Sequence, residues 1–443
     1  KSYSNTVSSR DLVDIFCPRE LGFALDSTQL VDTLGGWSFY GSEPFELLTG
    51  GDDLLELRKL MRPYKEDTFC EIPFLGGAVG FISYDYGRCL ETIPSISAND
   101  LVLPNYCFGL YDGIVAKNTA SGEVFLIASE VKESAEETFV RLDSIIQSDR
   151  QQTQADGRFS FSDWRWDTSE AGFCASVEQI KSHIALGDVY QVNLSRRRDV
   201  LFDGAIVDLY QALRKGNPAP YSGFFNGDGV QLISTSPEQF LKKSKDNLVT
   251  RPIKGTRPRG KTEAEDRLLA KDLELSEKDR AELLMIIDLE RNDLGRIAEF
   301  GSVSANTDFN IEYYKSVMHA TAQVTSSVVF FADSFNAALA AALELLVDRR
   351  ELDTAVDVLL HLVPRRRLDV LEDDELRPVV AVLVEAELVE PARDVALARL
   401  GRGAPVPALA RQRRLVQPAP GLLVHKPRGR QRVQARGSHR EAR

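Results

Sequence analysis

The chain has 443 residues, a formal net charge of −12, 43% hydrophobic and 27% charged residues, which are values typical of a globular protein. This length predicts two domains or one large domain, and the acidic charge argues against a general nucleic-acid-binding protein. There is no signal-like N-terminus and no apolar run long enough to span a bilayer, and the five cysteines lack Cys-x-x-Cys spacing. We therefore expect a cytoplasmic protein without a membrane or nucleic-acid partner, a zinc site or disulfides.

Residues 1–147 are predicted to form a mixed α and β region. Strands are expected where short apolar runs lie between turn signals, and helices where apolar residues recur at helical spacing. The expected strands are Leu21–Leu25, Trp37–Tyr40, Leu75–Gly87, Asn105–Lys117 and Gly122–Ala128, and the expected helices are Asp52–Met61 and Ser134–Gln147. The Gly-rich stretch Leu75–Gly87 lacks the Gly-x-Gly-x-x-Gly spacing before a helix, so a dinucleotide site is not favoured.

Residues 148–162 are polar and have no periodicity, which predicts a linker or long loop before a second region, residues 163–336. Helices are expected at Ser169–Leu186, Asp203–Arg214, Lys261–Ser276 and Lys278–Asp293, strands at Val189–Ser195, Tyr221–Phe225, Val230–Thr235 and Phe240–Lys243, and a helix or strand at Tyr313–Ser326. Hairpins rather than regular β-α-β repeats favour an antiparallel α+β architecture.

The cationic segment Arg251–Gly260 carries the strongest chemical signal. Its two prolines resist helix and Gly255 permits a left-handed turn, so a loop is expected. Lys254 lies between isoleucine and glycine, and partial desolvation in such a setting makes a neutral, nucleophilic amine available. Glu238 lies upstream at the end of an expected strand, and a hairpin would bring this carboxylate to the amine. The alternative is a solvated basic loop.

Two further residues are weaker candidates. Glu282 lies inside the apolar run Ala281–Ile287 of an expected helix, where a buried carboxylate needs a partner or a cation. The alternative is an exposed helix edge with a salt bridge. His319 is isolated in the sequence, and such a histidine is more often a core or surface residue than a catalyst.

The composition changes abruptly from about Ala337. Residues 337–443 contain no Phe, Tyr, Trp, Ile, Met or Cys and are rich in Arg, Ala, Leu, Val and Pro. Helical propensity persists over Ala337–Leu362, and the chain from Gly401 is expected to be disordered. One interpretation is a basic tail that binds nucleic acid or an acidic partner. We favour a shifted or reversed reading frame of GC-rich DNA, because this residue set makes a poor core.

Four segments, in this order, resemble the chorismate-utilising enzymes, which include the large subunits of anthranilate synthase and aminodeoxychorismate synthase. They are Gly187–Ser195, Ser236–Phe240, Arg251–Arg259 and Asp279–Arg296. The resemblance extends over about Leu21 to His319 and is absent after roughly Phe335. It implies layered antiparallel β-sheets wrapped by helices, with the site between the sheets, followed by an aberrant helical or disordered tail.

Within this family the residue at Lys254 separates two branches. Anthranilate synthases carry Pro-Ile-Ala-Gly-Thr, whereas Pro-Ile-Lys-Gly-Thr marks the large subunit of aminodeoxychorismate synthase. The resemblance implies that Lys254 displaces the 4-hydroxyl of chorismate through a covalent adduct, and that ammonia then gives 4-amino-4-deoxychorismate, the precursor of p-aminobenzoate and folate. Glu238 would transfer the protons, Gly255 and Thr256 would bind the substrate, and His319 would assist at the leaving oxygen.

The resemblance also implies a cofactor and partners. A magnesium ion would bind the ring carboxylate, with Glu282 as one ligand. Ammonia would come from a separate glutamine amidotransferase subunit. The segments Leu25–Ser27 and Asn217–Tyr221 match those that form a tryptophan pocket in relatives. They make Ser27, Pro220 and Tyr221 candidates for an N-terminal ligand pocket, although a plain turn residue is the alternative for Ser27.

The chain departs from the family after His319. The family's last third carries a Gly-Ser-x-Thr-Gly-Ala-Pro-Lys segment, a second magnesium-binding glutamate, a Cys-Gly-Ser segment, a substrate-binding arginine and a Gly-rich carboxylate cradle, none of which is found. Magnesium held by Glu282 alone would bind weakly, since hard cations need several oxygen ligands. The alternatives are therefore an anthranilate synthase component I or a catalytically dead remnant.

Overall fold

The fold was analysed in a computed structural model. It describes residues 1–3, 7–30, 34–51, 53–64, 71–90, 99, 101–149, 158–189, 192, 194–327, 359–363 and 379–386. Its elements belong to two compact units. One holds helix α5 (Glu170–Leu186), in which Ile180 is buried, and the other holds all the remaining described elements.

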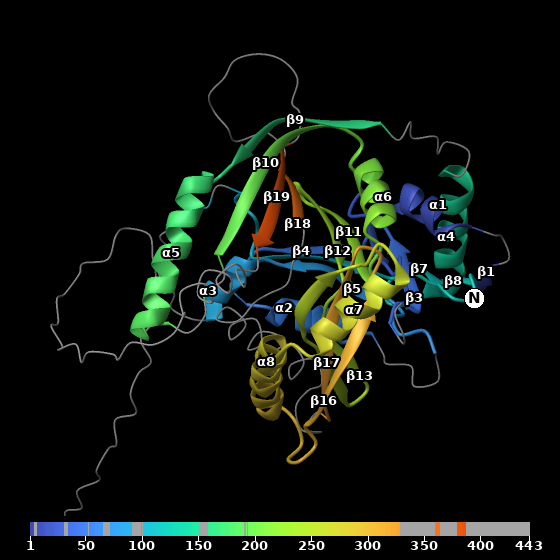
Figure 1. The fold of residues 1–443 in the computed structure, drawn as a ribbon. Coiled ribbons are helices and arrows are strands. Elements are labelled where there is room, and N and C mark those ends of the chain that lie inside the picture. The colour runs from blue at the N-terminus through green and yellow to red at the C-terminus, as the bar shows by residue number, and fades with distance from the viewer. Residues whose placement is uncertain are drawn as a thin grey trace, which may run out of the picture. The chain divides into compact units, whose positions relative to one another are not determined.

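The largest sheet is antiparallel and joins strands from both halves of the sequence (Figure 1). In spatial order it contains β1 (Ser2–Tyr3), β8 (Val124–Ala128), β7 (Gly113–Asn118), β3 (Trp37–Gly41), β2 (Phe23–Asp26), β11 (Tyr221–Gly227), β12 (Val230–Ser236), β18 (Leu359–Val363), β19 (Val379–Ala386), β10 (Leu194–Gly204) and β9 (Phe159–Trp166). Strand β2 pairs with β11, with Asp26 opposite Ser222. This pairing brings the two segments of the predicted N-terminal pocket side by side.

Three helices contribute to one core of the large sheet. They are α1 (Ser9–Phe16), α4 (Ala135–Asp149) and α6 (Ile206–Gly216). Their buried residues, among them Phe16, Ile146 and Tyr210, pack with Phe202 and Phe224 of the strands. Helix α1 begins at a capping box, in which the Ser8 hydroxyl accepts from the backbone N–H of residue 11 and that residue's carboxylate accepts from the N–H of Ser8.

A second, three-stranded sheet lies within the N-terminal region. It contains β4 (Glu46–Thr49), β6 (Tyr106–Tyr111) and β5 (Gly77–Ile82), and the neighbouring helical segments are α2 (Leu55–Met61), the 3₁₀ turn η1 (Tyr84–Tyr86) and α3 (Gly87–Leu90). The single strand predicted over residues 105–117 is wrong, because the chain turns at Asp112 and β7 joins the large sheet. The buried Asp112 carboxylate accepts hydrogen bonds of 2.7–2.8 Å from the backbone N–H groups of residues 131–133, which fixes this turn.

The third sheet carries the predicted catalytic residues. It contains β13 (Gln239–Ser244), β14 (Asn247–Arg251), β15 (Ile253–Pro258), β17 (Val317–Ser327) and β16 (Ser304–Tyr313). Strands β14 and β15 pair with β17 in almost one register, with Thr250 opposite Val324 and Ile253 opposite Thr321. They form one long strand interrupted at Pro252, which has no N–H to donate. The loop predicted over residues 251–260 is therefore wrong.

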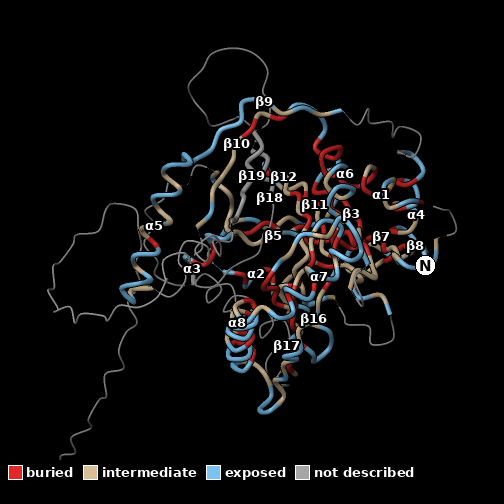
Figure 2. Tube along the Cα trace, in the orientation of Figure 1, coloured by how far each residue is buried: buried red, intermediate tan, exposed pale blue. Residues whose placement is uncertain are grey.

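Helices α7 (Glu263–Glu274) and α8 (Glu277–Gly295) cover one face of this third sheet (Figure 1). The even-numbered residues of β17, Met318, Ala320, Ala322 and Val324, are buried against them. Side chains alternate along a strand, so the odd-numbered residues lie on the opposite face. Figure 2 shows that α8 itself is buried on one side only, which agrees with buried Leu283 and 40% exposed Leu284.

The predicted α+β fold with antiparallel sheets is confirmed. The linker predicted over 148–162 is wrong at its ends, because α4 reaches Asp149 and β9 begins at Phe159. The rings of Phe159 and Phe161 pack at a tilt against Phe202, with centroids 6.0 and 5.6 Å away, and this packing stabilises the start of β9 in the sheet. The division into regions at residues 147, 162 and 336 stays a prediction.

Other predicted elements also differ from the structure, and the strand predicted over Leu75–Gly87 is limited to β5, with η1 and α3 after it. The strand predicted at Val189–Ser195 begins at Leu194 instead and runs to Gly204, because Val200 and Phe202 are buried at alternate positions in the core. Within the predicted helical stretch Ala337–Leu362, the described part is strand β18, whose backbone pairs with β12 and β19. Tertiary pairing there overrides helical propensity. The rest of residues 337–443, apart from β19, lies outside the described residues.

Helices of the described part of the chain are too short or too polar to cross a bilayer.

Candidate active site

Lys254 lies in a β-bulge. Ile253 is opposite Thr321 and Thr256 is opposite His319, so three residue steps along β15 match two along β17. Gly255 has a φ of +80°, and Lys254 is only 5% exposed. A bulge re-aims side chains locally, and bulges occur often beside active sites. The predicted left-handed glycine is confirmed, but it serves a bulged strand and not a loop.

Gly255 also fills a place where no side chain fits. A Cβ there would meet the Asp279 Cβ at 2.8 Å and the Leu273 Cδ1 at 2.9 Å. Gly255→Ala is expected to lower the free energy of unfolding by about 2–4 kcal/mol, since it adds overpacking to backbone strain. Gly122→Ala is the matched control, because Gly122 has a φ of +76° with open space around it. Urea denaturation should show a cost of about 1 kcal/mol for the control; equal costs for both variants would contradict the packing argument.

The face of the third sheet opposite the helices is polar. Thr256, His319 and Glu312 are direct neighbours across three strands. The Thr256 Oγ1 and His319 Nδ1 atoms are hydrogen-bonded at 2.9 Å. Burial lowers the pKa of His319 to about 4, so its imidazole is neutral near pH 7. The histidine can therefore accept or donate a hydrogen bond there without carrying charge.

Glu238 lies at the end of the β13–β14 hairpin. Its backbone N–H donates to the Ser236 Oγ at 3.2 Å, which shapes the Ser-Pro-Glu turn. The next residue, Gln239, is opposite Arg251, so Glu238 lies beside the start of the Pro252–Lys254 stretch. The predicted hairpin is confirmed. Contact between the Glu238 carboxylate and the Lys254 amine stays a prediction.

The arginine side chains after Lys254 form ion pairs with acidic side chains of the same chain. Arg257 pairs with Asp272 at 2.7 Å and with Asp279 at 3.1 Å. Arg259 pairs with Asp266 at 2.6 Å and lowers the pKa of that carboxyl to about 2. The alternative of a solvated basic loop is therefore wrong.

A buried cluster that the sequence analysis missed lies beside these residues. Glu312, 2% exposed, forms an ion pair with Arg251 and accepts hydrogen bonds from the hydroxyls of Thr321 at 3.1 Å and Tyr314 at 2.8 Å. From the large sheet, Tyr221 donates to the Gln239 Oε1 at 2.6 Å. A side-chain hydrogen bond between Tyr221 and Gln239 thus connects the large sheet with the third sheet.

Glu282 does not have the surroundings predicted for a metal ligand. Its carboxylate is 28% exposed and lies 3.7 Å from the Lys278 Nζ, as in the alternative of a helix edge with a salt bridge. Among the described residues, no group of three or more His, Cys, Asp or Glu side chains is arranged to hold a metal ion. These residues do not fit a magnesium site. Magnesium binding by Glu282 stays a prediction, and no chemical step below depends on it.

The candidates for the N-terminal pocket divide into two groups. The Ser27 Oγ lies 3.0 Å from the Pro220 carbonyl oxygen and 2.7 Å from that of Trp37. This hydroxyl therefore connects the end of β2 with the first residue of β3 and the residue before β11. Ser27 also lines a cavity of about 590 Å³ between α1 and α6, whereas Pro220 and Tyr221 are not part of its lining. The Tyr221 hydroxyl donates its hydrogen bond to the side chain of Gln239. Ligand binding at this cavity stays a prediction.

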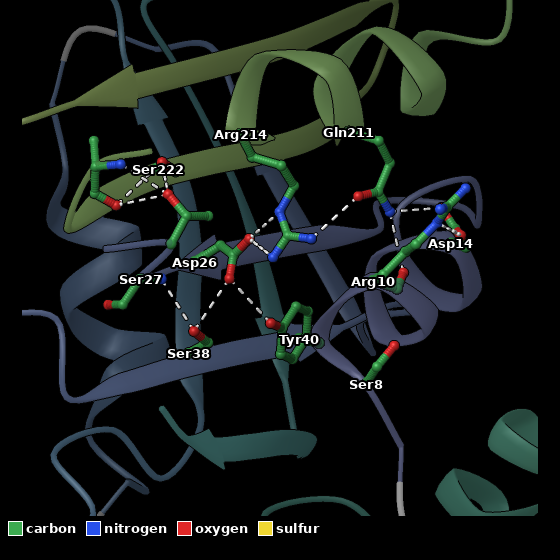
Figure 3. Close-up of polar contacts among 12 residues, drawn as sticks. Ser8, Arg10, Asp14, Asp26, Ser27, Ser38, Tyr40, Gln211, Arg214 and Ser222 are labelled. Atoms are coloured by element: carbon green, nitrogen blue, oxygen red, sulfur yellow. Dashed lines mark hydrogen bonds and ion pairs between the residues drawn. The ribbon is translucent and has the colours of Figure 1, made fainter. Parts of the chain in front are cut away.

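Asp26, beside Ser27, is the centre of a buried polar network that the sequence did not reveal (Figure 3). It pairs with Arg214 at 2.6 Å and accepts hydrogen bonds of 3.1 Å from Ser38 and Tyr40. Burial raises the pKa of Tyr40 well above its ordinary value, so this phenol stays a donor. The network holds β2, β3 and α6 together.

Comparison with known proteins agrees with this arrangement. The model of the chorismate binding enzyme family matches residues 39–337. The chain belongs to this family. Of its four motif segments, Gly187–Ser195 is described only in part, since residues 190, 191 and 193 lie outside the described residues.

Curated relatives include both branches of the family. The chain is 38% identical over 289 residues to aminodeoxychorismate synthase component 1 of Bacillus subtilis, covering 63% of this chain and 60% of that protein. It is 37% identical over 323 residues to anthranilate synthase component 1 3 of Haloarcula marismortui, covering 67% and 63%. The chain thus spans about three fifths of the length of these relatives.

Among solved structures, anthranilate synthase component I from Streptococcus pneumoniae has the same fold. The TM-score is 0.63 at 23% identity, covering 83% of this chain and 91% of that one.

Proposed function

We propose that this chain is the large subunit of an aminodeoxychorismate synthase, which converts chorismate and ammonia to 4-amino-4-deoxychorismate. The observation that carries the proposal is Lys254, an amine 5% exposed on a bulged strand, where the anthranilate branch has alanine. Overall similarity does not separate the two branches, because the identities are 38% and 37%. Lys254 favours the aminodeoxychorismate synthase branch, because the alanine of the anthranilate branch offers no nucleophile.

In the first step the neutral Lys254 amine bonds to a ring carbon of chorismate. The carbon–oxygen bond of the 4-hydroxyl breaks, the double bonds shift, and the hydroxyl leaves as water after accepting a proton. Glu238 supplies this proton and takes the one that the lysine nitrogen releases. His319 is held by Thr256 through Nδ1, which leaves Nε2 for a hydrogen bond with the leaving oxygen.

In the second step ammonia bonds to the ring and the lysine nitrogen leaves with a proton, which restores the free amine. Both curated relatives are named component 1, which supports a second component. In this proposal the second component is a glutamine amidotransferase that releases ammonia.

Purified protein given chorismate, magnesium and ammonium chloride is expected to form 4-amino-4-deoxychorismate, identified by chromatography and mass spectrometry. Glutamine should replace ammonium only when a glutamine amidotransferase is added. Anthranilate as the product would support the sister activity. Chorismate binding without any turnover would support a catalytically dead remnant.

A further inference from the structure

Tyr314 lies in the turn between β16 and β17 and is 3% exposed. Its backbone N–H donates to the Val317 carbonyl at 2.9 Å, and its own carbonyl accepts from Arg259 at 2.6 Å. Hydrogen bonds of both its backbone N–H and its backbone carbonyl therefore fix the position of Tyr314. None of the four family segments contains it, and the chemistry proposed above does not use it.

The Tyr314 hydroxyl connects two of the segments that carry predicted catalytic residues. It donates to the Glu312 Oε2 at 2.8 Å, and Glu312 in turn holds Arg251, three residues before Lys254. The same hydroxyl lies 3.5 Å from the carbonyl oxygen of Pro237, the residue before Glu238, but its single proton goes to the nearer Glu312. A phenylalanine would keep the ring and lose the hydrogen bond to Glu312.

The Tyr314 ring contacts the third segment. It packs edge-on against His319, with ring centroids 5.2 Å apart and an interplanar angle of 64°. The His319 Nδ1 atom is hydrogen-bonded to the Thr256 hydroxyl. The histidine ring is thus held between a threonine hydroxyl and a buried aromatic ring.

We propose that Tyr314 is a positioning residue, which fixes the Arg251 end of the Lys254 strand through Glu312 and fixes the His319 ring relative to that strand. This role rests on the proposed function, since it concerns the same reaction. Burial and the neighbouring Glu312 carboxylate raise the pKa of Tyr314, so the hydroxyl keeps its proton and remains a donor to Glu312. A buried carboxylate with three partners is fixed in place, and its partners are fixed with it.

Tyr314→Phe is expected to lower kcat by about 10-fold to 100-fold, because small misplacements of reacting groups cost that much. KM for chorismate should stay within about twofold, since the hydroxyl is not assigned to substrate binding. Tyr313→Phe is the matched control, because Tyr313 is the adjacent tyrosine and is 46% exposed. It should leave both constants unchanged.

A Tyr314→Phe enzyme that keeps more than half of the wild-type kcat would overturn the proposal. Loss of the folded state in this variant, seen by circular dichroism, would also overturn it and make the hydroxyl a structural requirement only.

A second measurement does not need turnover. In Tyr314→Leu, the pKa of His319 followed by NMR should rise from about 4 toward its ordinary value of about 6.5, while Tyr313→Leu leaves it unchanged. An unchanged His319 pKa in Tyr314→Leu would overturn the proposal. If the wild-type protein itself turns over no chorismate, the proposed function fails, and this titration still decides whether Tyr314 holds His319.

Discussion

Lys254→Ala is expected to lower the rate of 4-amino-4-deoxychorismate formation by about 10³-fold or more, since it removes the proposed nucleophile. With chorismate and no ammonia, the wild-type protein should gain the mass of chorismate less one water, because the adduct cannot be resolved. The alanine variant should show no gain. When ammonia is supplied, any residual product of the alanine variant is expected to be anthranilate, because alanine is the residue of that branch.

Two further variants separate the nucleophile from the charge. Lys254→Arg keeps a cation but not a nucleophilic amine, so it should also form no adduct. Lys242→Ala removes an exposed lysine of the same sheet and should form the adduct at the wild-type rate. An adduct in the alanine variant, in a sample that is folded and binds chorismate, would exclude Lys254 as the nucleophile.

The segment around Lys254 shows how far the sequence could be interpreted. Its chemistry was visible locally, as a lysine beside a glycine with an unusual backbone angle. Its structure was not, because proline and glycine are also typical of loops. The strand exists because Ile253 and Thr256 pair with Thr321 and His319, more than sixty residues later. Pairing of this kind is set by long-range contacts that local propensity does not contain.

The missed residues have a common physical origin. Glu312 and Asp26 are acids whose arginine partners, Arg251 and Arg214, lie far away in the sequence, and Tyr314 belongs to the Glu312 cluster. Nothing in the neighbourhood of an acid indicates that it will be buried with a distant arginine. Helix caps are local by contrast: Ser276, placed in the preceding helix by the sequence analysis, accepts from the backbone N–H at the start of α8.

The burial expected around Glu282 shows the opposite error. The run Ala281–Ile287 is apolar in composition, and a metal-binding carboxylate was one interpretation. In the structure Leu284 and Met285 are 40% and 36% exposed, so apolar composition did not mean burial on every side. Composition was a better guide to the end of the family resemblance. The family match stops at residue 337, where the residue set changes, and the shifted reading frame stays a prediction.

Asp26→Ala is expected to lower the free energy of unfolding by about 3–5 kcal/mol, because it leaves the Arg214 guanidinium buried without its carboxylate. The side chains of Asp26 and Arg214 are 1% and 13% exposed, so water replaces little of the lost interaction. Ser38 and Tyr40 lose their acceptor as well. Guanidinium denaturation followed by circular dichroism measures the change.

The surface pair of Asp85 and Arg88 provides the control. These side chains also lie 2.8 Å apart, but they are 55% and 33% exposed, so Asp85→Ala should cost only about 0–1 kcal/mol. Adding Arg214→Met to Asp26→Ala should recover part of the loss, since the uncompensated buried charge is then removed. Equal losses for Asp26→Ala and Asp85→Ala would contradict burial as the cause. A double variant no more stable than Asp26→Ala would show that the hydrogen bonds of Ser38 and Tyr40 matter more than the charge.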